Sequence, residues 1–135
     1  PLKILGVPIK ISASCNRVAV IDGHTQCVSV RLRHSATAQQ IIDAWERYRS
    51  EPQSLALPMA PRQPIHYFHE DAFPQPRKHR MLEHGMAVSI GRLRPCPIFG
   101  WKFTGLSHNT IRGAAGGAIL NAELLKAKGF LSKGV

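Results

Sequence analysis

The sequence predicts an α+β fold, with a mixed and largely antiparallel sheet and packed helices. Two observations support this prediction. Several short segments alternate apolar and polar residues, which is typical of half-buried strands, and two longer segments repeat apolar residues at helical spacing. The chain has 135 residues, of which 44% are hydrophobic, so it is long enough to bury the core of one domain.

The first third of the chain is expected to form strands. Over Ile9–Cys15 the apolar residues occupy the odd positions, which predicts a strand. If the alternation continues, Arg17 lies on the inward face, where an arginine needs an anionic partner. Asp22-Gly23 is a typical hairpin turn. The strand after it places His24 on the core side, on the same face as Val28.

A helix is expected to begin after Thr37, because Thr37 and Gln40 have the spacing of a capping box. Its apolar residues at helical spacing are Ile41, Ile42, Trp45 and Tyr48. The helix is expected to end before Pro52, since proline disfavours a helical residue before it. The prolines that follow, up to Pro64, predict a loop.

The remaining elements follow from the same patterns. Alternation predicts three more strands, and a segment rich in alanine, leucine and glycine predicts a C-terminal helix that ends at Gly129. The strands are expected over Ile65–Glu70, Met86–Leu93 and Trp101–Ser107, and the helix over Ile111–Lys128. Three glycines near the start of this helix favour close helix–sheet packing over a phosphate-binding role. These glycines are Gly113, Gly116 and Gly117.

The chain is strongly basic, with 18 Lys and Arg against 8 Asp and Glu and a formal net charge of +10. Such a balance favours anionic partners, such as nucleic acids, nucleotide phosphates or acidic metabolites. A nucleic-acid partner is not favoured, because the chain has no known nucleic-acid motif and no interleaved aromatic residues. The densest basic cluster, from Arg77 to Arg80, is expected to be a solvated loop.

Neither a disulfide framework nor a metal site is expected. Cys15, Cys27 and Cys96 lack C-x-x-C spacing, which favours buried structural thiols. His66 and His69 would point to opposite faces of a strand, so they do not indicate a metal. No apolar run is long enough to span a bilayer and no secretory-type segment begins the sequence, so a cytoplasmic location and no membrane partner are expected.

Five motifs occur in order along nearly the whole chain. They are Ser-Ala-Ser-Cys-Asn-Arg-Val-Ala-Val-Ile-Asp-Gly-His-Thr at 12–25, Pro-Gln-Pro-Arg at 74–77, Val-Ser-Ile-Gly-Arg-Leu-Arg at 88–94, Leu-Ser-His-Asn-Thr with Gly-Ala-Ala-Gly at 106–116, and Ile-Leu-Asn-Ala-Glu-Leu-Leu-Lys-Ala-Lys-Gly at 119–129. Through these motifs the chain resembles the C-terminal part of fungal-type aspartate-semialdehyde dehydrogenases. The resemblance implies that residues 1–135 form a single dimerisation domain, with a fold like the C-terminal domain of glyceraldehyde-3-phosphate dehydrogenase-like enzymes.

The resemblance also implies a reaction and roles for three residues. In that family, a nucleotide-binding domain and a substrate and dimerisation domain together convert aspartyl phosphate to the semialdehyde with NADPH, through a cysteine thioester. The resemblance implies that Arg17 clamps the substrate carboxylate and that His24 exchanges protons with the cysteine and the intermediate. It further implies that Asn109 lies near the nicotinamide end of the cofactor site.

Each of these three residues also has a purely structural interpretation. Arg17 is compatible with a salt bridge in the core, and His24 with a buried histidine whose hydrogen bonds are satisfied. Asn109 is equally compatible with a cap at the entry of the last helix. The residues alone leave these alternatives open.

The chain departs from the family pattern at several points. It has no G-x-G-x-x-G segment, so it contains no dinucleotide-binding domain and is not expected to bind NADP alone. The family's nucleophilic cysteine has no counterpart, because Cys15 matches a structural position in its motif. Pro95-Cys96 replace residues that are usually acidic in the family.

Three hypotheses for the function follow. The chain is a piece of a dehydrogenase that retains substrate-side residues and a homodimer surface but is inactive alone. Alternatively, it is a short stand-alone relative, which Pro1 would fit if an initiator methionine has been removed. It would then use His24 and Arg17 for hydride-free isomerisation, cyclisation or hydrolysis of a small anionic substrate. A non-enzymatic interaction module, either a partner subunit or a nucleic-acid binder, is the least favoured.

Overall fold

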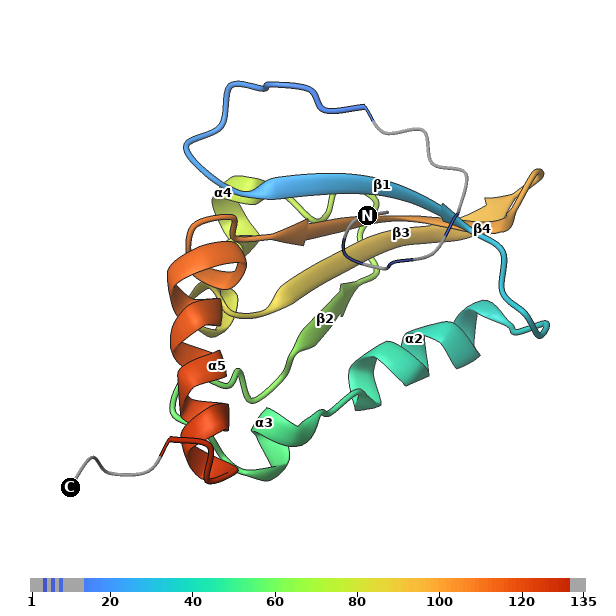
Figure 1. Cartoon of the computed structure of the whole chain (residues 1–135). Helices are drawn as coiled ribbons and strands as arrows, with labels where there is room; N and C mark the ends of the chain where they lie inside the picture. The colour runs from blue at the N-terminus through green and yellow to red at the C-terminus, as the bar shows by residue number, and fades with distance from the viewer. Residues whose placement is uncertain (1–3, 5, 7, 9–13, 132–135) are drawn as a thin grey trace.

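The computed structural model describes residues 4, 6, 8 and 14–131, and its centre is a four-stranded sheet (Figure 1). The strands are β1 (His24–Val30), β2 (Ile65–Phe68), β3 (Val88–Cys96) and β4 (Gly100–Ser107), in the order β1-β4-β3-β2. β4 is antiparallel to both β1 and β3, whereas β2 is parallel to β3. The prediction of a mixed, largely antiparallel sheet is therefore confirmed.

Two longer helices lie at opposite ends of the sheet, α2 near the end of β1 and α5 beside its start (Figure 1). The helical segments are α2 (Ala38–Arg47), α3 (Glu51–Ser54), α4 (Pro76–His79), η1 (Leu82–Gly85), η2 (Ile111–Ala115) and α5 (Gly116–Ala127). None of the described helices is long and apolar enough to cross a membrane.

The predicted capping box at the start of α2 is present. The Thr37 side chain accepts a hydrogen bond from the Gln40 backbone N–H, and the Gln40 side chain accepts one from the Thr37 N–H. These bonds satisfy two backbone donors that would otherwise lack a partner at the helix start. Farther along α2, the Trp45 ring packs on Tyr67 of β2 and Phe103 of β4, with ring centroids 5.9 and 5.0 Å apart. The helix thus covers one face of the sheet at this end.

The apolar core lies where α5 meets the segment before β3. Met86 is 2% exposed and packs with Leu57 and Leu120, while partly buried apolar residues surround this cluster. Gly116 makes the close approach possible, because a Cβ at this position would lie 2.6 Å from the Met86 sulfur. The close packing expected for this glycine is therefore present.

Three element boundaries differ from the sequence prediction. The short helix α3 overlaps the start of the predicted proline loop, because Pro52 occupies the first turn of the helix, where no N–H donor is needed. β2 ends at Phe68 and not at Glu70. β3 continues through Pro95 to Cys96, beyond the last residue of β2 that pairs with it, so the proline removes no hydrogen bond to β2.

The predicted strand over Ile9–Cys15 falls mostly on residues outside the described part of the chain. Residues 14–23 are described and form no strand. Arg17 is exposed, so its predicted inward orientation is wrong. The physical reason is that the first described strand begins at His24, so the side chains of residues 14–23 have no sheet face of their own into which they could point.

Candidate functional site

The turn that precedes β1 is fixed by the conformation and the surroundings of Gly23. This glycine is buried and has a φ of 105°, which L side chains rarely adopt. A Cβ here would also lie 3.3 Å from Leu106 Cδ1 and 3.4 Å from Pro76 Cβ. Gly23 therefore allows the chain to turn directly against β4 and α4, and His24 follows it at the first position of β1.

The side chain of Asn109, which follows the end of β4, holds this turn. Its Oδ1 accepts a hydrogen bond of 2.6 Å from the Gly23 N–H. Asn109 follows β4, whose last residue, Ser107, pairs with His24. The structure therefore places Asn109 at the same end of the sheet as His24. Asn109 is not the helix cap, because Thr110 occupies the N-cap position of η2.

His108 serves as the acceptor at the entry of this last helical segment. Its Nδ1 accepts hydrogen bonds from the backbone N–H groups of Ile111 and Thr110, at 3.2 and 3.3 Å. Because Nδ1 accepts these bonds, the hydrogen-bond network assigns the proton of the neutral ring to Nε2. Nε2 lies 3.5 Å from Oδ1 of Asp22. His108 is 4% exposed, so this contact is largely shielded from water.

Arg80 is the second partner of the Asp22 carboxylate. Its Nε forms an ion pair with Asp22 Oδ1, and the two side chains are 19% and 24% exposed. The desolvation of such a pair costs free energy, which the close contact offsets, so loss of one partner is destabilising. Arg80 follows α4, and its Nη1 donates to the Arg77 carbonyl at 3.3 Å. The basic cluster is therefore not simply a solvated loop, and that prediction is wrong for Arg80.

His79 anchors α4, and with it Arg80, against the sheet. The ring is 8% exposed and lies 4.4 and 4.6 Å, between centroids, from Phe68 and Phe73. Its Nδ1 accepts the Gln75 backbone N–H at 2.9 Å. The sequence pattern does not indicate the roles of His79, Arg80 and His108, because a run of basic residues and a lone histidine give no sign of burial. The acidic Asp22 at a turn was the one available signal for a cationic partner.

Arg17 and His24 are both exposed. Among the described residues, neither side chain has a hydrogen-bond or ion-pair partner. The core salt bridge considered for Arg17 and the buried histidine considered for His24 are therefore wrong, and so is the core-side position of His24. His24 does share a sheet face with Val28, which pairs with Phe103 beneath Trp45. However, α2 covers only that end of the strand.

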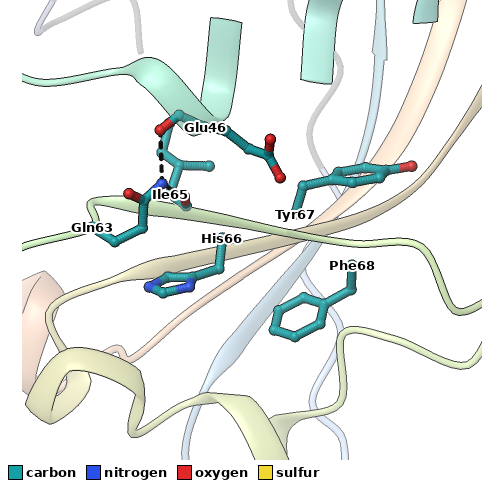
Figure 2. A pocket seen from close by; sticks show the side chains of 6 residues that line it. All are labelled: Glu46, Gln63, Ile65, His66, Tyr67 and Phe68. Carbon is teal, nitrogen blue, oxygen red and sulfur yellow. Dashed lines mark hydrogen bonds between the residues drawn. The ribbon is translucent and has the colours of Figure 1, made fainter. Parts of the chain in front are cut away.

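An open groove of about 320 Å³ lies between α2 and the edge strand β2, away from this turn (Figure 2). Its lining residues are Glu46, Gln63, Ile65, His66, Tyr67 and Phe68. Figure 2 shows the Gln63 side chain donating to the Glu46 carbonyl, at 2.9 Å, across one end of the groove. The lining contains no lysine or arginine and neither Arg17 nor His24, so the groove has no cation suited to a carboxylate substrate.

The three cysteines are free thiols, and the expectation that they are buried is wrong. Cys15 and Cys27 are exposed and Cys96 is half-buried. Cys15 lies in the uncovered segment before β1, and Cys27 lies on the uncovered outward face of β1, which is an edge strand. The backbone N–H of Phe99 and, next, that of Ile98 hold the pKa of the Cys96 thiol below its usual value, by stabilising the thiolate. Among the described residues, no three His, Cys, Asp or Glu side chains are grouped as a metal site would require.

Sequence comparison decides the family. A model of the family described as "Semialdehyde dehydrogenase, dimerisation domain" matches residues 2–112. The chain belongs to this family. The predicted resemblance is thus confirmed. The family description identifies the matched residues as a dimerisation domain.

Two fungal relatives and two solved structures show how far the similarity extends. The aspartate-semialdehyde dehydrogenases of Trichophyton rubrum and Schizosaccharomyces pombe are 46% and 48% identical to this domain over 92% and 90% of it. The NADP-containing crystal structure of the Candida albicans enzyme matches 93% of the chain at 42% identity, with a TM-score of 0.82. Aspartate-semialdehyde dehydrogenase II of Vibrio cholerae matches 82% at 29% identity, with a TM-score of 0.62.

These matches confirm the predicted fold class, that of the C-terminal domain of glyceraldehyde-3-phosphate dehydrogenase-like enzymes. They also show how much of each relative's length this domain covers. The domain spans 35% of the length of each of the two fungal enzymes and 37% of the Candida albicans chain. About two thirds of each relative therefore has no counterpart in these 135 residues.

Proposed function

We propose that this domain supplies the substrate-side half of an aspartate-semialdehyde dehydrogenase-like active site. Arg17 binds a substrate carboxylate, and His24 exchanges a proton with the reacting groups. The observation that carries the proposal is the hydrogen bond between Asn109 and Gly23. It fixes the backbone next to His24 while the imidazole remains exposed and available to a substrate.

The chemistry of the two side chains suits these roles. A guanidinium binds a carboxylate through two parallel hydrogen bonds, and it remains charged at any working pH. An imidazole can accept a proton from a nucleophile and return it to an intermediate near neutral pH. The segment that carries Arg17 is exposed, so substrate binding is expected to order it over His24.

The NADP site fits these residues only in part. Asn109 Oδ1 already accepts the Gly23 N–H, which leaves its Nδ2 as a donor for a cofactor carboxamide. The described residues provide no Gly-rich strand–turn–helix for a pyrophosphate. The cofactor in its reduced form, NADPH, would supply the hydride in this family, and we assign its binding and the nucleophilic cysteine to parts of a complete enzyme outside this chain.

Homodimer formation is the second part of the proposal. The family description names a dimerisation domain, and several large apolar side chains are exposed on the described surface. Those that lie around β1, at the β3–β4 hairpin and on α5 include Val18, Ile21, Ile98, Phe99 and Ile119. A second copy of the chain would remove such side chains from water, which favours association.

The exposed imidazole of His24 also suits a second function, hydride-free acid/base chemistry on a small anionic metabolite. In that case the domain would act without a nucleotide cofactor, as an isomerase, cyclase or hydrolase. Turnover of a dicarboxylate or acyl phosphate by the pure chain, abolished by His24→Ala, would favour this function over the first.

Succinate, a small dicarboxylate, tests the proposed site directly. We expect succinate to perturb the NMR signals of the His24 ring and the Arg17 guanidinium together. Arg17→Ala should weaken binding by about 2 kcal/mol, because one carboxylate of succinate loses its charged hydrogen-bond partner. Arg33→Ala removes the same charge from another exposed position and should leave binding unchanged. Equal effects of the two substitutions would show nonspecific attraction to a basic chain and contradict the proposal.

A further inference from the structure

The turn before His24 is held by three side chains from two other parts of the fold. Arg80, which follows α4, pairs with the Asp22 carboxylate. His108 follows the end of β4, and its Nε2 lies 3.5 Å from the same carboxylate oxygen. Asn109 accepts the N–H of Gly23 at 2.6 Å. We call Arg80, His108 and Asn109 the turn clamp.

All three contacts of the turn clamp are made to Asp22 or Gly23, and none is made to the imidazole of His24. The clamp therefore restricts the backbone that carries His24 and leaves the ring free to react. Its members are also shielded from solvent, with the side chains of His108 and Arg80 5% and 19% exposed. Shielding strengthens both the ion pair and the hydrogen bonds, because competing water is excluded.

The segment that carries His108 and Asn109 has an unusual backbone. Residues Ile111–Ala115 form a π-helical turn, in which the Ala115 N–H donates to the Thr110 carbonyl and the Gly113 N–H to the His108 carbonyl. Single π-helical turns occur frequently at functional sites. Here the backbone N–H groups of Thr110 and Ile111 donate to Nδ1 of His108. The same ring orientation directs Nε2–H toward Asp22.

We propose that Arg80, His108 and Asn109 are positioning residues that fix His24 through Asp22 and Gly23. This inference rests on the proposed acid/base role of His24 and adds residues to the same site. It also changes the expectation for Asn109. The amide oxygen of Asn109 serves the backbone of the turn, so the main contribution of this residue is to hold His24 and not to contact a cofactor.

A matched pair of substitutions tests Asn109. Asn109→Leu and Asn109→Asp are similar in size, but only aspartate retains an acceptor at Oδ1. We expect Asn109→Leu to speed hydrogen exchange of the Gly23 amide by about tenfold or more and to lower the NMR order parameter of the His24 amide. Asn109→Asp should restore both values. Unchanged exchange and order in Asn109→Leu would overturn the role of Asn109.

The two nitrogens of His108 can be tested separately. Asparagine places an acceptor near the position of Nδ1, whereas glutamine places a donor near the position of Nε2. We expect His108→Asn to loosen the His24 amide while the Thr110 and Ile111 amides stay protected. His108→Gln should expose the Thr110 and Ile111 amides to exchange, while the His24 amide keeps its order. If His108→Asn leaves the order of the His24 amide unchanged, His108 is a helix cap alone and its part in the clamp is overturned.

Arg80→Gln and Arg77→Gln separate the ion pair from the general effect of charge. Both remove one positive charge from the same short segment, but Arg77 is exposed, and the structure shows no ion pair for it among the described residues. Only Arg80→Gln should lower the order of the His24 amide. Equal effects would mean that overall charge matters and the specific contact does not, which would overturn the role of Arg80.

Succinate titration of the same variants links the clamp to the proposed function. We expect Asn109→Leu to weaken succinate binding by about fivefold or more, on the order expected for one lost hydrogen bond, with a thermal midpoint close to that of Asn109→Asp. If the unsubstituted chain binds no succinate, the proposed function fails. The exchange and order measurements need no ligand, so they still decide whether the clamp holds His24.

Discussion

The Oδ1 atom of Asn109 lies 2.6 Å from the backbone nitrogen of Gly23, 86 residues earlier in the chain. This hydrogen bond joins the residue before the first strand to a residue just beyond the last one. A contact between such distant parts of the chain must be formed against a large loop-closure entropy, so the native sheet has to bring the two residues together first. The bond therefore depends on the completed β1–β4 pairing.

Substitution of Gly23 should be more destabilising than substitution of another glycine with a similar backbone. We expect Gly23→Ala to lower the free energy of unfolding by roughly 2 kcal/mol or more, through the positive φ and the contacts with Leu106 and Pro76. Gly129 has a φ of 79°, and a Cβ added there would have no atom within 4 Å, so Gly129→Ala should cost about 1 kcal/mol. Urea denaturation of both variants measures the difference, and equal losses would contradict the packing argument.

Truncation of Met86 should destabilise the domain through loss of core packing. Met86 is 2% exposed, and we expect Met86→Ala to cost about 2–5 kcal/mol, from lost burial and the cavity that remains. Met81 is 52% exposed, and Met81→Ala should change stability by about 0.5 kcal/mol or less. Thermal unfolding compares the two variants. Similar midpoints would show that the cluster around Met86 is not the main core.

The proposed homodimer should become tighter as salt is added. Each chain carries a formal net charge of +10, so two copies repel one another, and salt screens this repulsion. Light scattering at low and moderate NaCl, over micromolar to sub-millimolar protein, should show a mass that rises with salt. A constant mass of 14.9 kDa, that of one chain, would contradict the dimer.

Alkylation should find Cys96 reactive at a lower pH than a free cysteine. The Phe99 N–H stabilises the thiolate and lowers the pKa of Cys96, so the native thiol stays deprotonated at pH values where a free thiol is protonated. The same difference implies that native stability increases slightly as pH rises between the native and the unfolded pKa. The pH profile of iodoacetamide labelling in a Cys15→Ser, Cys27→Ser variant measures Cys96 alone. A profile like that of a free thiol would contradict the expectation.

The pure chain should not form NADPH from aspartate semialdehyde, NADP and phosphate. We assign the cysteine nucleophile and the nucleotide-binding site to other parts of a complete enzyme, so neither the covalent step nor the hydride transfer is expected here. Absorbance at the NADPH band measures the reaction. Steady NADPH formation that is lost in Cys15→Ser would contradict this prediction and identify Cys15 as the nucleophile.

Local patterns predicted most of the fold. The Thr37–Gln40 capping box and the strands around Val28, Ile90 and Phe103 are present, because these signals depend on residues close in sequence. The pattern failed for Arg17, since alternation does not reveal whether a strand has a partner. It also fails at α3, because a proline is compatible both with a loop and with the first turn of a helix.

The candidate site could be predicted only in part. The motifs identified His24 and Asn109, and the structure places them at the same end of the sheet. The partners of Asp22 were not predicted, because Arg80 and His108 are distant in sequence and their burial depends on how α4 and β4 pack. The basic run around Arg80 was interpreted as solvated, although its last residue is paired with a carboxylate. Long-range electrostatic contacts of this kind leave no periodic signal.

The strand order β1-β4-β3-β2 affects how the protein can fold while it is being synthesised. Among the four described strands, β1 is made before the others, but its only described neighbour is β4, the last of the four to be made. At translation rates of about 5–20 residues per second, β1 waits several seconds or more without a partner. During that interval its exposed edge can pair with other nascent chains. Slow codons for residues 31–100, or chaperones that bind this segment during synthesis, would therefore change the yield of folded protein more than its free energy of unfolding.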